Sequence, residues 1–405
     1  MTRKLIFAAL SLIFIVNLKA CTTAIISGKC TPDGRPILWK HRDSGTFENK
    51  LMYFDDGIYH YIGLINSNDS LGKEVWAGSN SAGFSIMNSA SYNLIIGEEP
   101  ERKDEEGIFM KRALQQCATL EDFEQLLNET AGDRGIEANF GVIDAHGGAA
   151  YYETDHNHYF KIDADDPAAA PFGYIIRTNY SFSGKIDTGY GFIRYQTAEE
   201  LFYQAVAENK LSLQFVITEA DRNIYQSLTK TDLRKPPLPA SKDHTKYVSF
   251  EDYINRYTSV STMIVHGVMP GESPDLTTIW TIPGFPLCSV AVPSWVAAGP
   301  ELPSELTAPG DSNSPLCEKA LQLKNKCFPI KRGSGKKYLN LAQLLNAEGD
   351  GILQITPVIE NKIIDKTEPF LLKWQDDGFN KKEAQALYDI FDEIINSEFN
   401  HYFGF

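Results

Sequence analysis

The chain has 405 residues, of which 43% are hydrophobic and 22% are charged. These fractions are those of an ordinary globular protein, and they exclude intrinsic disorder, collagen-like repeats and a protein with many membrane spans. The formal net charge of −15 opposes binding to a phosphate backbone, so we expect no nucleic-acid partner. Six cysteines are too few for a disulfide scaffold.

Residues 1–20 have the features of an export signal. Two basic residues precede an apolar run over residues 5–16, which is too short to span a bilayer, and a small residue, Ala20, ends the segment. Cleavage after Ala20 would make Cys21 the first residue of the mature chain. We therefore predict a signal peptide over residues 1–20 and a periplasmic or secreted location.

The same boundary permits a second interpretation. Leu18-Lys19-Ala20-Cys21 resembles a bacterial lipobox, in which Cys21 would carry a lipid and bring the chain to a membrane. A lipoprotein usually has a flexible polar tether after its cysteine. Here a strand-forming run starts at once, which favours a structural or catalytic Cys21 over a lipid anchor.

The first element expected after Cys21 is a hairpin, with strands at 22–27 and 36–40 and a turn at Pro32-Asp33-Gly34. A Gly-rich turn is expected at 78–83. Further strands are expected at 51–54, 58–65, 84–88, 139–144, 149–153, 158–162, 174–178, 258–265, 277–281 and 289–292. Helices are expected at 105–117, 120–129, 197–208, 211–221 and 381–399. Two segments are expected to be irregular, 231–255 and 293–315.

Strands, paired helices and then further strands predict one α+β domain with helix layers on packed sheets. No internal repeat and no clean linker divides the chain. We place the catalytic domain at residues 21–300 and treat residues 301–405 as a loop and helical extension packed on the same domain. Cys317 and Cys327 could form a disulfide in an exported protein.

Cys21 is the candidate nucleophile. A cysteine that is the first residue has a base of its own, because the free α-amine has a pKa of about 7.7–8.0 and reaches the thiol through one water. The amine activates the sulfur and then passes the proton to the leaving nitrogen. The alternative is a small buried cysteine that only packs in the core.

The candidate partners of Cys21 lie at the ends of predicted strands. Asp43 lies across the hairpin from Cys21 and could hold the α-ammonium group. Asn88 and Asn179 each end a hydrophobic strand, where an amide can donate to a developing oxyanion. Arg256 precedes a strand that looks buried. Each of these residues also has a simpler interpretation, as a turn former or a surface ion pair.

Lys40 and Arg42 are expected to share one face of the return strand, where they could stabilise a thiolate or bind substrate. His41 is then expected to face the other way. The sequence has no Walker P-loop, GxGxxG, HExxH, CxxC or GxSxG motif, so we expect no metal, no cofactor and no serine nucleophile.

The segment CTTAIISGKCTPDGRPILWKHRD resembles the mature start of the cysteine N-terminal nucleophile (Ntn) hydrolases, which include choloylglycine hydrolases and acyl-coenzyme A:isopenicillin N acyltransferases. That pattern has a Cys-Thr start, a DG turn and a basic residue three positions before an aspartate. Lys40 and Asp43 hold the last two positions, although the family usually has arginine where this chain has Lys40. GSNSAGFSIMNSASYN, RTNYSF and NRYTSVSTMIVHGV resemble the segments that carry two asparagines and a late arginine, which map to Asn88, Asn179 and Arg256.

The resemblance implies a four-layer αββα fold with two antiparallel sheets between helices. It implies hydrolysis or acyl transfer at a linear amide C–N bond, through a thioester on the cysteine. The implied catalytic residues are Cys21, Asp43, Asn88, Asn179 and Arg256, and the implied substrate-binding residues are Lys40 and Arg42. The implied partner is a small-molecule amide with an acyl group, and the chain could form a homo-oligomer.

Two alternatives stay open. One is a cysteine dipeptidase of the same superfamily, although its usual Arg-Asn-x-Asp after the turn is absent here. The other is a non-catalytic, lipid-anchored binding protein of the cell envelope.

Overall fold

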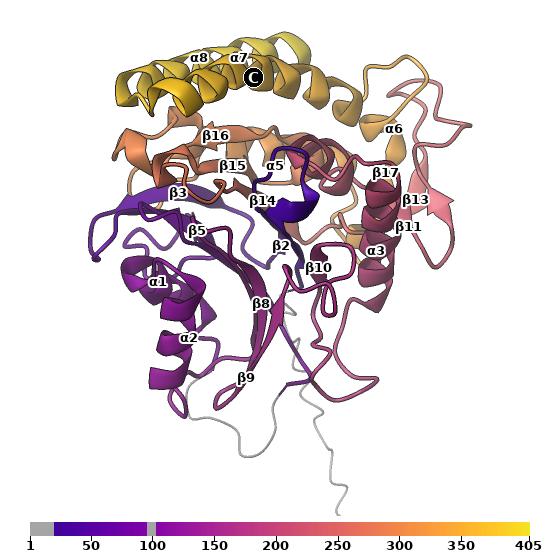
Figure 1. The fold of residues 1–405 in the computed structure, drawn as a ribbon. Coiled ribbons are helices and arrows are strands. Elements are labelled where there is room, and N and C mark those ends of the chain that lie inside the picture. Colours follow the sequence, from indigo (N-terminus) through magenta and orange to yellow (C-terminus); the bar gives the residue numbers. More distant parts are fainter. Residues whose placement is uncertain (1–19, 95–102) are drawn as a thin grey trace, which may run out of the picture.

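The computed structural model describes residues 20–94 and 103–405, so the predicted signal peptide lies outside the described residues except for Ala20. Two large antiparallel sheets are stacked face to face between layers of helices (Figure 1). The N-terminal hairpin lies in the middle of one sheet, so the start of the chain is built into the core.

The six-stranded sheet contains the candidate nucleophile's strand at a central position. Strand β1 pairs with β10 on one side, where Thr23 faces Arg177, and with β2 on the other side, where Thr23 faces Lys40. In spatial order the strands are β10 (Tyr174–Arg177), β1 (Thr22–Ile26), β2 (Ile37–Asp43), β14 (Ser259–His266), β15 (Thr278–Pro283) and β16 (Val292–Ser294).

The seven-stranded sheet is a meander whose strands pair in chain order. They are β3 (Asn49–Phe54), β4 (Tyr61–Asn66), β5 (Ala77–Asn80), β6 (Ser85–Ala90), β7 (Ala138–Ile143), β8 (Ala149–Thr154) and β9 (Tyr159–Asp163). Two small two-stranded sheets stand apart from this sandwich: β11 (Tyr225–Gln226) with β12 (Thr231–Asp232), and β13 (Tyr247–Ser249) with β17 (Tyr338–Asn340).

Helices α1 (Glu106–Gln116) and α2 (Leu120–Glu129) cover the outer face of the seven-stranded sheet (Figure 1). Helix α1 buries the face expected from its 3.6-residue period, and α2 begins with a capping box in which the side chains of Thr119 and Asp122 each accept from the other's backbone N–H. An aromatic and aliphatic core fills the space between this helix pair and the sheet.

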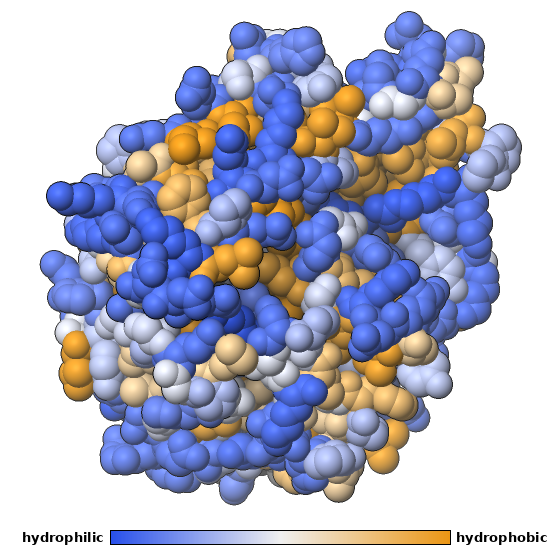
Figure 2. Space-filling view, turned by 45° about the horizontal axis from the view of Figure 1, so that its top comes forward, coloured by the Kyte–Doolittle hydropathy of each residue, from blue (hydrophilic) through white to orange (hydrophobic). Residues whose placement is uncertain are grey.

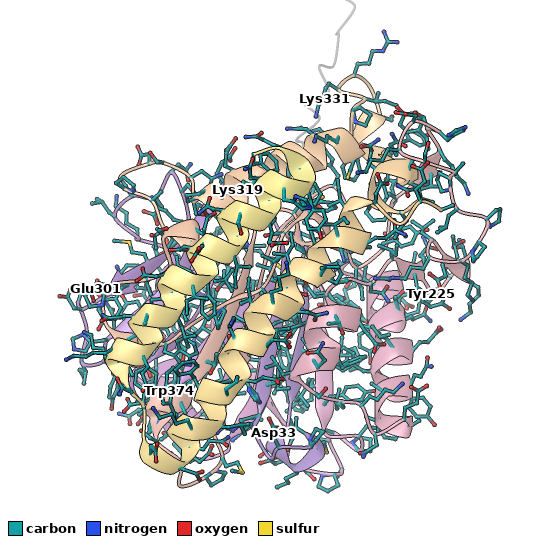
Figure 3. The ribbon with its side chains drawn as sticks, turned by 90° about the horizontal axis from the view of Figure 1, so that it is seen from above. Asp33, Tyr225, Glu301, Lys319, Lys331 and Trp374 are labelled. Atoms are coloured by element: carbon teal, nitrogen blue, oxygen red, sulfur yellow. The ribbon has the colours of Figure 1, made fainter. Side chains whose placement is uncertain are left out.

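Helices from the second half of the chain lie on the other side of the sandwich. They are α3 (Phe192–Ala207), α4 (Leu213–Phe215), α5 (Pro315–Cys327), α6 (Leu341–Leu344), α7 (Ile352–Asp377) and α8 (Lys381–Phe403). Helices α7 and α8 run side by side across this face (Figure 3), and the aromatic side chain of Trp374 packs edge-on against Trp295 next to β16. The order helix, sheet, sheet, helix confirms the predicted four-layer αββα class.

The sequence-predicted elements are mostly confirmed, with shifts of a few residues at their ends. Two differ more: the strand expected at 289–292 is found at Val292–Ser294, and the helix expected at 211–221 is the short α4 followed by a π-helical turn at Val216–Ala220. Residues 78–80 belong to strand β5, so the expected turn at 78–83 is shorter than predicted. Helix α3 begins at Phe192, five residues earlier than expected. Helices α5 and α7 were not predicted at all. Helix α7 runs unbroken through Pro357 and Pro369, although a proline has no backbone N–H to donate within the helix. The packing of α7 against β16 and α8 stabilises the helix despite these missing hydrogen bonds.

The expected disulfide is wrong. Cys317 and Cys327 lie on one helix, α5, ten residues apart, which at 1.5 Å per residue is a separation of about 15 Å. The Sγ atom of Cys327 instead lies 3.9 Å from that of Cys288, and both are reduced. The boundary between a catalytic domain and an extension at residue 300 stays a prediction.

The face of the molecule seen in Figure 2 is mostly hydrophilic, with hydrophobic side chains visible in patches between the polar ones. Over residues 20–94 and 103–405, no helix has the length and apolar character needed to cross a membrane.

Candidate active site

Cys21 lies immediately before strand β1 and is 5% exposed. Its Sγ atom is 4.0 Å from the main-chain oxygen of Asp43, because the β1–β2 pairing sets the start of β1 beside the end of β2. Thr23 and Ile25, which share a face of β1 with Cys21, reach Tyr151 and Gly141 of the facing sheet. The thiol therefore points between the two sheets.

The buried Asp43 and the partly buried Arg256 form an ion pair next to the Cys21 main chain. Arg256 Nε donates to Asp43 Oδ2 over 2.9 Å, and Arg256 Nη2 donates to the same oxygen and also to the carbonyl oxygen of Ala20, 2.7 Å away. The second carboxylate oxygen, Oδ1, accepts from Ser259 Oγ over 2.7 Å. This pair therefore flanks the peptide bond between Ala20 and Cys21.

Arg194 connects Cys21 to Asn179. From the first turn of α3 its guanidinium group donates to the Cys21 carbonyl oxygen over 2.6 Å, to Thr22 Oγ1 over 2.9 Å and to Asn179 Oδ1 over 2.7 Å. Burial and the nearby charge of Arg256 lower the pKa of Arg194 to about 9. Gly191, in the left-handed region at a φ of 89°, makes room for this side chain, since a Cβ there would lie 2.3 Å from Arg194 Nη2.

Lys40 orients Asn88. The buried Lys40 Nζ donates to Asn88 Oδ1 over 2.6 Å and to the main-chain oxygen of Trp76. Because the amide oxygen of Asn88 is held in this way, its Nδ2 group is turned away from Lys40, and no hydrogen bond of Nδ2 occurs within the described residues. Asn179 differs, since its Nδ2 donates to the Ala90 carbonyl oxygen over 2.8 Å. Asn88 is therefore the better placed of the two amides to donate to an oxyanion.

Arg42 shares the face of β2 on which Lys40 lies, as predicted. Its guanidinium group lies 4.9 Å from the centre of the Trp76 ring and donates to Asn66 Oδ1 over 2.8 Å. Burial lowers the pKa of Arg42 to about 10, against the opposing effect of negative charge at Cys21 and Glu74. Arg42 is therefore held in place by Trp76 and Asn66.

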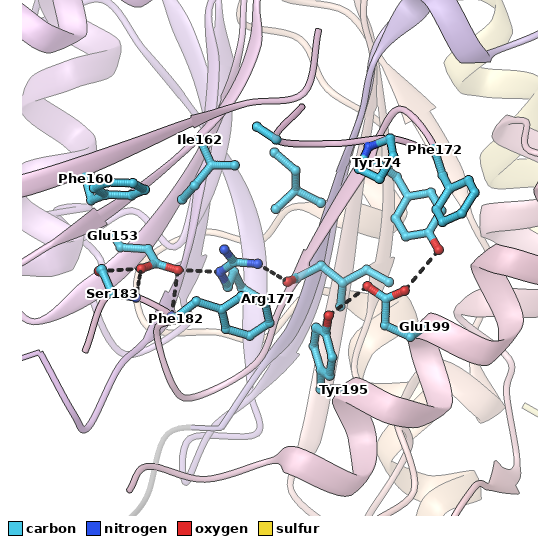
Figure 4. A pocket seen from close by; sticks show the side chains of 14 residues that line it. Glu153, Phe160, Ile162, Phe172, Tyr174, Arg177, Phe182, Ser183, Tyr195 and Glu199 are labelled. Atoms are coloured by element: carbon cyan, nitrogen blue, oxygen red, sulfur yellow. Dashed lines mark hydrogen bonds and ion pairs between the residues drawn. The ribbon is translucent and has the colours of Figure 1, made fainter. Parts of the chain in front are cut away.

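An apolar pocket of about 620 Å³ opens beside strand β10, the neighbour of β1 (Figure 4). Phe160, Ile162, Phe172 and Phe182 are among the side chains that line it. At its centre Arg177 lies over the Phe182 ring at 4.1 Å and donates through Nε to Glu153 Oε1 over 2.6 Å. The Arg177 carbonyl oxygen accepts from Thr23 Oγ1 over 2.9 Å, which ties this pocket to the strand of the candidate nucleophile.

The predicted residues fall into three connected groups. Asp43 and Arg256 contact each other and flank Cys21, Asn179 reaches the main chain of Cys21 through Arg194, and Lys40 holds Asn88 on the inner face of the sandwich. His41 faces away from Lys40 and Arg42, as expected, and contacts the opposite side of the sheet. The catalytic and substrate-binding roles given to these residues stay predictions.

Sequence reasoning missed Arg194, Ser259, Asp221 and the Arg177–Glu153 pair. Arg194 lies just before the helix that the sequence predicts, and its partner Cys21 is 173 residues away along the chain. No local pattern could indicate that contact. Ser259 had one usable signal, because it lies three residues after Arg256 in the segment that carries the family resemblance.

The comparisons with known proteins give one family match. The family model described as acyl-coenzyme A:6-aminopenicillanic acid acyl-transferase matches residues 32–224. The match includes Lys40, Asp43, Asn88 and Asn179, whereas Cys21 precedes it and Arg256 follows it. The sequence has no significant match among curated proteins. The family match and the four-layer fold confirm the resemblance to the acyltransferase-like Ntn hydrolases.

Solved structures with a similar arrangement are distant in sequence. Penicillin V acylase from Agrobacterium tumefaciens is 12% identical, with a TM-score of 0.40 over 68% of this chain and 86% of that one. A mutant conjugated bile acid hydrolase from Clostridium perfringens is 10% identical, with a TM-score of 0.38 over 65% and 89%. The Caenorhabditis elegans ortholog of N-acylethanolamine-hydrolyzing acid amidase is 14% identical, with a TM-score of 0.34 over 48% and 86%.

Proposed function

We propose that the chain is exported, that its mature form begins at Cys21, and that the Cys21 thiolate attacks the carbonyl of a linear amide. The leaving amine departs with a proton from the α-ammonium group, and a thioester on Cys21 results. Water or a second amine then takes the acyl group, giving hydrolysis or acyl transfer. The observation that carries this proposal is the Asp43–Arg256 ion pair against the peptide between Ala20 and Cys21.

Removal of residues 1–20 would turn the main-chain nitrogen of Cys21 into a free α-amine. This amine would lie next to the position at which Arg256 now donates to the Ala20 carbonyl oxygen. Asp43, with one oxygen held by Arg256 and the other by Ser259, would then hold that amine in reach of its own thiol. Asn88 Nδ2, with its orientation fixed by Lys40, supplies an oxyanion donor. Arg194 supports the main chain of Cys21 from the opposite side.

The lipid-anchor alternative receives no support from the geometry around Cys21. Strand β1 begins at the next residue, Thr22, and both Ala20 and Cys21 are buried. A lipidated cysteine needs a tether that reaches the membrane surface, and none is present between Cys21 and the sheet.

The apolar pocket beside β10 is the proposed site of the acyl group. Its volume of about 620 Å³ and its aromatic walls suit an apolar or aromatic acyl chain of drug-like size (Figure 4). Small acyl groups such as acetyl would leave most of this surface unfilled, so amides with larger acyl groups are the expected substrates.

A pair of matched proteins tests the mechanism. One is expressed as Met-Cys21 with the methionine removed by the host, and the other carries an additional alanine before Cys21. We expect the first to cleave N-acyl amides and the second to lose at least about 10³-fold in rate, because an amide nitrogen cannot accept the proton. Intact mass after substrate addition should show the acyl group on Cys21 in the first protein only.

The acyl group is varied at constant leaving amine, from acetyl to phenylacetyl and decanoyl. Higher kcat/KM for the larger groups supports the pocket assignment. Equal activity of the two proteins would disprove the N-terminal nucleophile mechanism, and a Cys21→Ser variant that retains full activity would disprove the nucleophile itself.

A further inference from the structure

A line of buried polar contacts runs from Asp43 away from the nucleophile. Ser259 Oγ, which donates to Asp43 Oδ1, lies 2.9 Å from His41 Nε2. The other ring nitrogen, His41 Nδ1, lies 2.9 Å from Asp221 Oδ1. All four side chains are at most 1% exposed, so water does not compete for these contacts.

Strand pairing places these residues together. His41 lies opposite Thr262 in the β2–β14 pair, and Asp43 lies opposite Ser259. A register shift between Ser259 and Ser261 gives β14 one additional residue at this point. The bulge lets Ser259 Oγ contact both His41 and Asp43, which are two residues apart on β2.

Asp221 approaches the ring from a different element. It follows the π-helical turn Val216–Ala220, and its main-chain oxygen accepts from Asn255 Nδ2 over 2.7 Å. Its carboxylate also accepts from Thr262 Oγ1 over 2.5 Å and Trp39 Nε1 over 3.3 Å. Asp221 is therefore fixed against His41 by groups that do not belong to the active site.

Counting hydrogens along this line gives the charge of the ring. Ser259 Oγ has one hydrogen, which it donates to Asp43, and it accepts from the Arg256 main-chain N–H over 3.1 Å. The contact from His41 Nε2 to Ser259 Oγ must then be an N–H that donates. Asp221 can only accept, so His41 Nδ1 also donates. Both ring nitrogens carry hydrogen in this arrangement, and the ring is an imidazolium.

Either neutral form of the His41 ring would break one of these contacts. With a hydrogen on Nε2 only, the lone pair of Nδ1 would face the Asp221 carboxylate at 2.9 Å. With a hydrogen on Nδ1 only, Nε2 must accept from Ser259, which has no second hydrogen for Asp43. Asp43 Oδ1 would then face a hydroxyl lone pair at 2.7 Å, which is repulsive. The hydrogen bond that Asp43 Oδ1 receives from Ser259 therefore requires a hydrogen on His41 Nε2.

Asp221 and Arg222 are the charged groups on the Nδ1 side of the ring. Burial by itself would raise the pKa of Asp221, but the hydrogen bond and charge of His41 and the charge of Arg222 lower it below the ordinary value. Arg222 Nη2 in turn donates to Glu360 Oε1 of α7 over 2.6 Å, and burial raises the pKa of Glu360 despite this contact.

Two further cations lie on the opposite side of Ser259. Arg256 is paired with Asp43, and Lys324 Nζ of α5 donates to the Ser259 main-chain oxygen over 3.3 Å. Burial lowers the pKa of Lys324 to about 7, so its charge near neutral pH is only partial. The charged side chains that contact His41 or Ser259 directly are those of Asp221, Asp43 and Lys324.

We propose that His41 is a positioning residue that, held by Asp221, acts through Ser259 to fix the carboxylate of Asp43 beside the Cys21 amine. This inference rests on the proposed function, since it assigns a role in the activation of Cys21. His41 contacts neither the thiol nor a substrate, and it takes no proton from Cys21.

The test uses mature protein that begins at Cys21 and the rate at which iodoacetamide alkylates Cys21, resolved by peptide mass spectrometry over a range of pH. We compare the parent with His41→Gln, Ser259→Ala, Ser259→Thr and the double variant His41→Gln/Ser259→Ala. The exposed Cys30, which lies far from the substituted residues along the chain, is the internal reference in the same sample. His266→Gln is the matched control. His266 is also buried, but it lies on the neighbouring strand β14, at the end far from Ser259, where it is paired with Asp33.

We expect His41→Gln and Ser259→Ala each to slow alkylation of Cys21 about tenfold or more and to change its pH profile in the same way, as for a lost hydrogen bond to a charged group. The double variant should be no slower than either single variant, because both changes break the same line. Ser259→Thr, which keeps a hydroxyl, and His266→Gln should match the parent. A parent-like profile for His41→Gln, or additive losses in the double variant, would overturn the proposal.

A second measurement does not depend on Cys21. In protein labelled with ¹⁵N-histidine, the His41 signals are those that disappear in His41→Gln, and both ring nitrogens should have the shifts of protonated nitrogen. One unprotonated nitrogen would contradict the proposal even if a variant fails to fold. If the alanine-extended protein is alkylated as fast as the mature one, the proposed function fails, whereas the ¹⁵N result still decides the state of His41.

Discussion

Two buried regions of this protein are held together in opposite ways. Between α1, α2 and the seven-stranded sheet, aromatic rings pack at centroid distances of 5.1–6.1 Å around Phe123. At the end of β2, the buried groups are instead charged or polar, with Asp43, Arg256 and His41 connected through Ser259. The first region can be assembled from any rings of the right size, whereas the second requires particular atoms.

The two regions contribute differently to the stability of the fold. Burying apolar rings stabilises the fold directly, at about 25 cal/mol per Å² of surface removed from water. Burying ion pairs gains little or nothing in net stability, because desolvation offsets the attraction. A polar network buried at the head of the strand that carries Cys21 is therefore better explained by positioning chemistry than by stabilising the chain.

The largest effect is expected where the polar network meets the nucleophile. Asp43→Asn keeps the size of the side chain but removes the charge that would hold the Cys21 amine. We expect a fall of about 10³-fold in kcat/KM, equal to about 4 kcal/mol, for the amide that the mature protein cleaves best. Asp33→Asn, which removes the carboxylate partner of His266, is the control and should keep its activity. Similar losses in both variants would show that the network has no special role.

A substitution in the aromatic region is expected to change stability and to leave the reactivity of Cys21 unchanged. Phe123→Ala removes a fully buried ring that contacts Phe84, Phe109, Phe140 and Tyr152. We expect the free energy of unfolding to fall by about 3–4 kcal/mol, measured by urea denaturation, because a large cavity remains. Alkylation of Cys21 in the folded variant should stay at the parent rate. A changed alkylation rate would mean that the two regions are coupled.

The smallest effect concerns the pH dependence of stability, at the border of the polar network. Lys324 lies buried 3.9 Å from the centre of the Phe47 ring, and burial lowers its pKa to about 7, against about 10.4 in the unfolded chain. Between these values the unfolded state binds more protons, so the free energy of unfolding should rise with pH from about 7 towards 10.

Lys324→Met should remove most of this dependence and raise stability near pH 7 by about 1–2 kcal/mol, because no buried ammonium group has to be neutralised. Lys319→Met is a matched control on the same helix, since Lys319 is paired with Glu305. Denaturation curves at several pH values measure both. A parent-like slope in Lys324→Met would show that Lys324 keeps its charge through contacts with the surrounding rings.

Local pattern was sufficient for most of the fold and for part of the site. Alternation and turn residues predicted the β1–β2 hairpin, and with it the approach of Asp43 to Cys21. The two-residue period of a strand also determined that Lys40 and Arg42 lie on one face and His41 on the other. These features depend on neighbours in sequence, so they can be inferred without the rest of the chain.

Only the tertiary structure decided which distant residues gather around Cys21 and His41. Arg194, from α3, contacts Cys21; Arg256, from the segment before β14, contacts Ala20; and Asp221, which follows a π-helical turn, contacts His41. Each of these contacts spans more than 170 residues. Helix α7 could not be predicted from local sequence either. Its two prolines disfavour a helix, and the packing of α7 on β16 and α8 stabilises it nevertheless. The amino-acid sequence by itself was enough for the class of fold, and it predicted the candidate nucleophile and the residues nearest to it. The buried polar network that contacts these residues depends on how the two sheets and their helices pack. A hydrogen bond between residues far apart in the chain produces no periodic pattern in the sequence, so it could not be predicted.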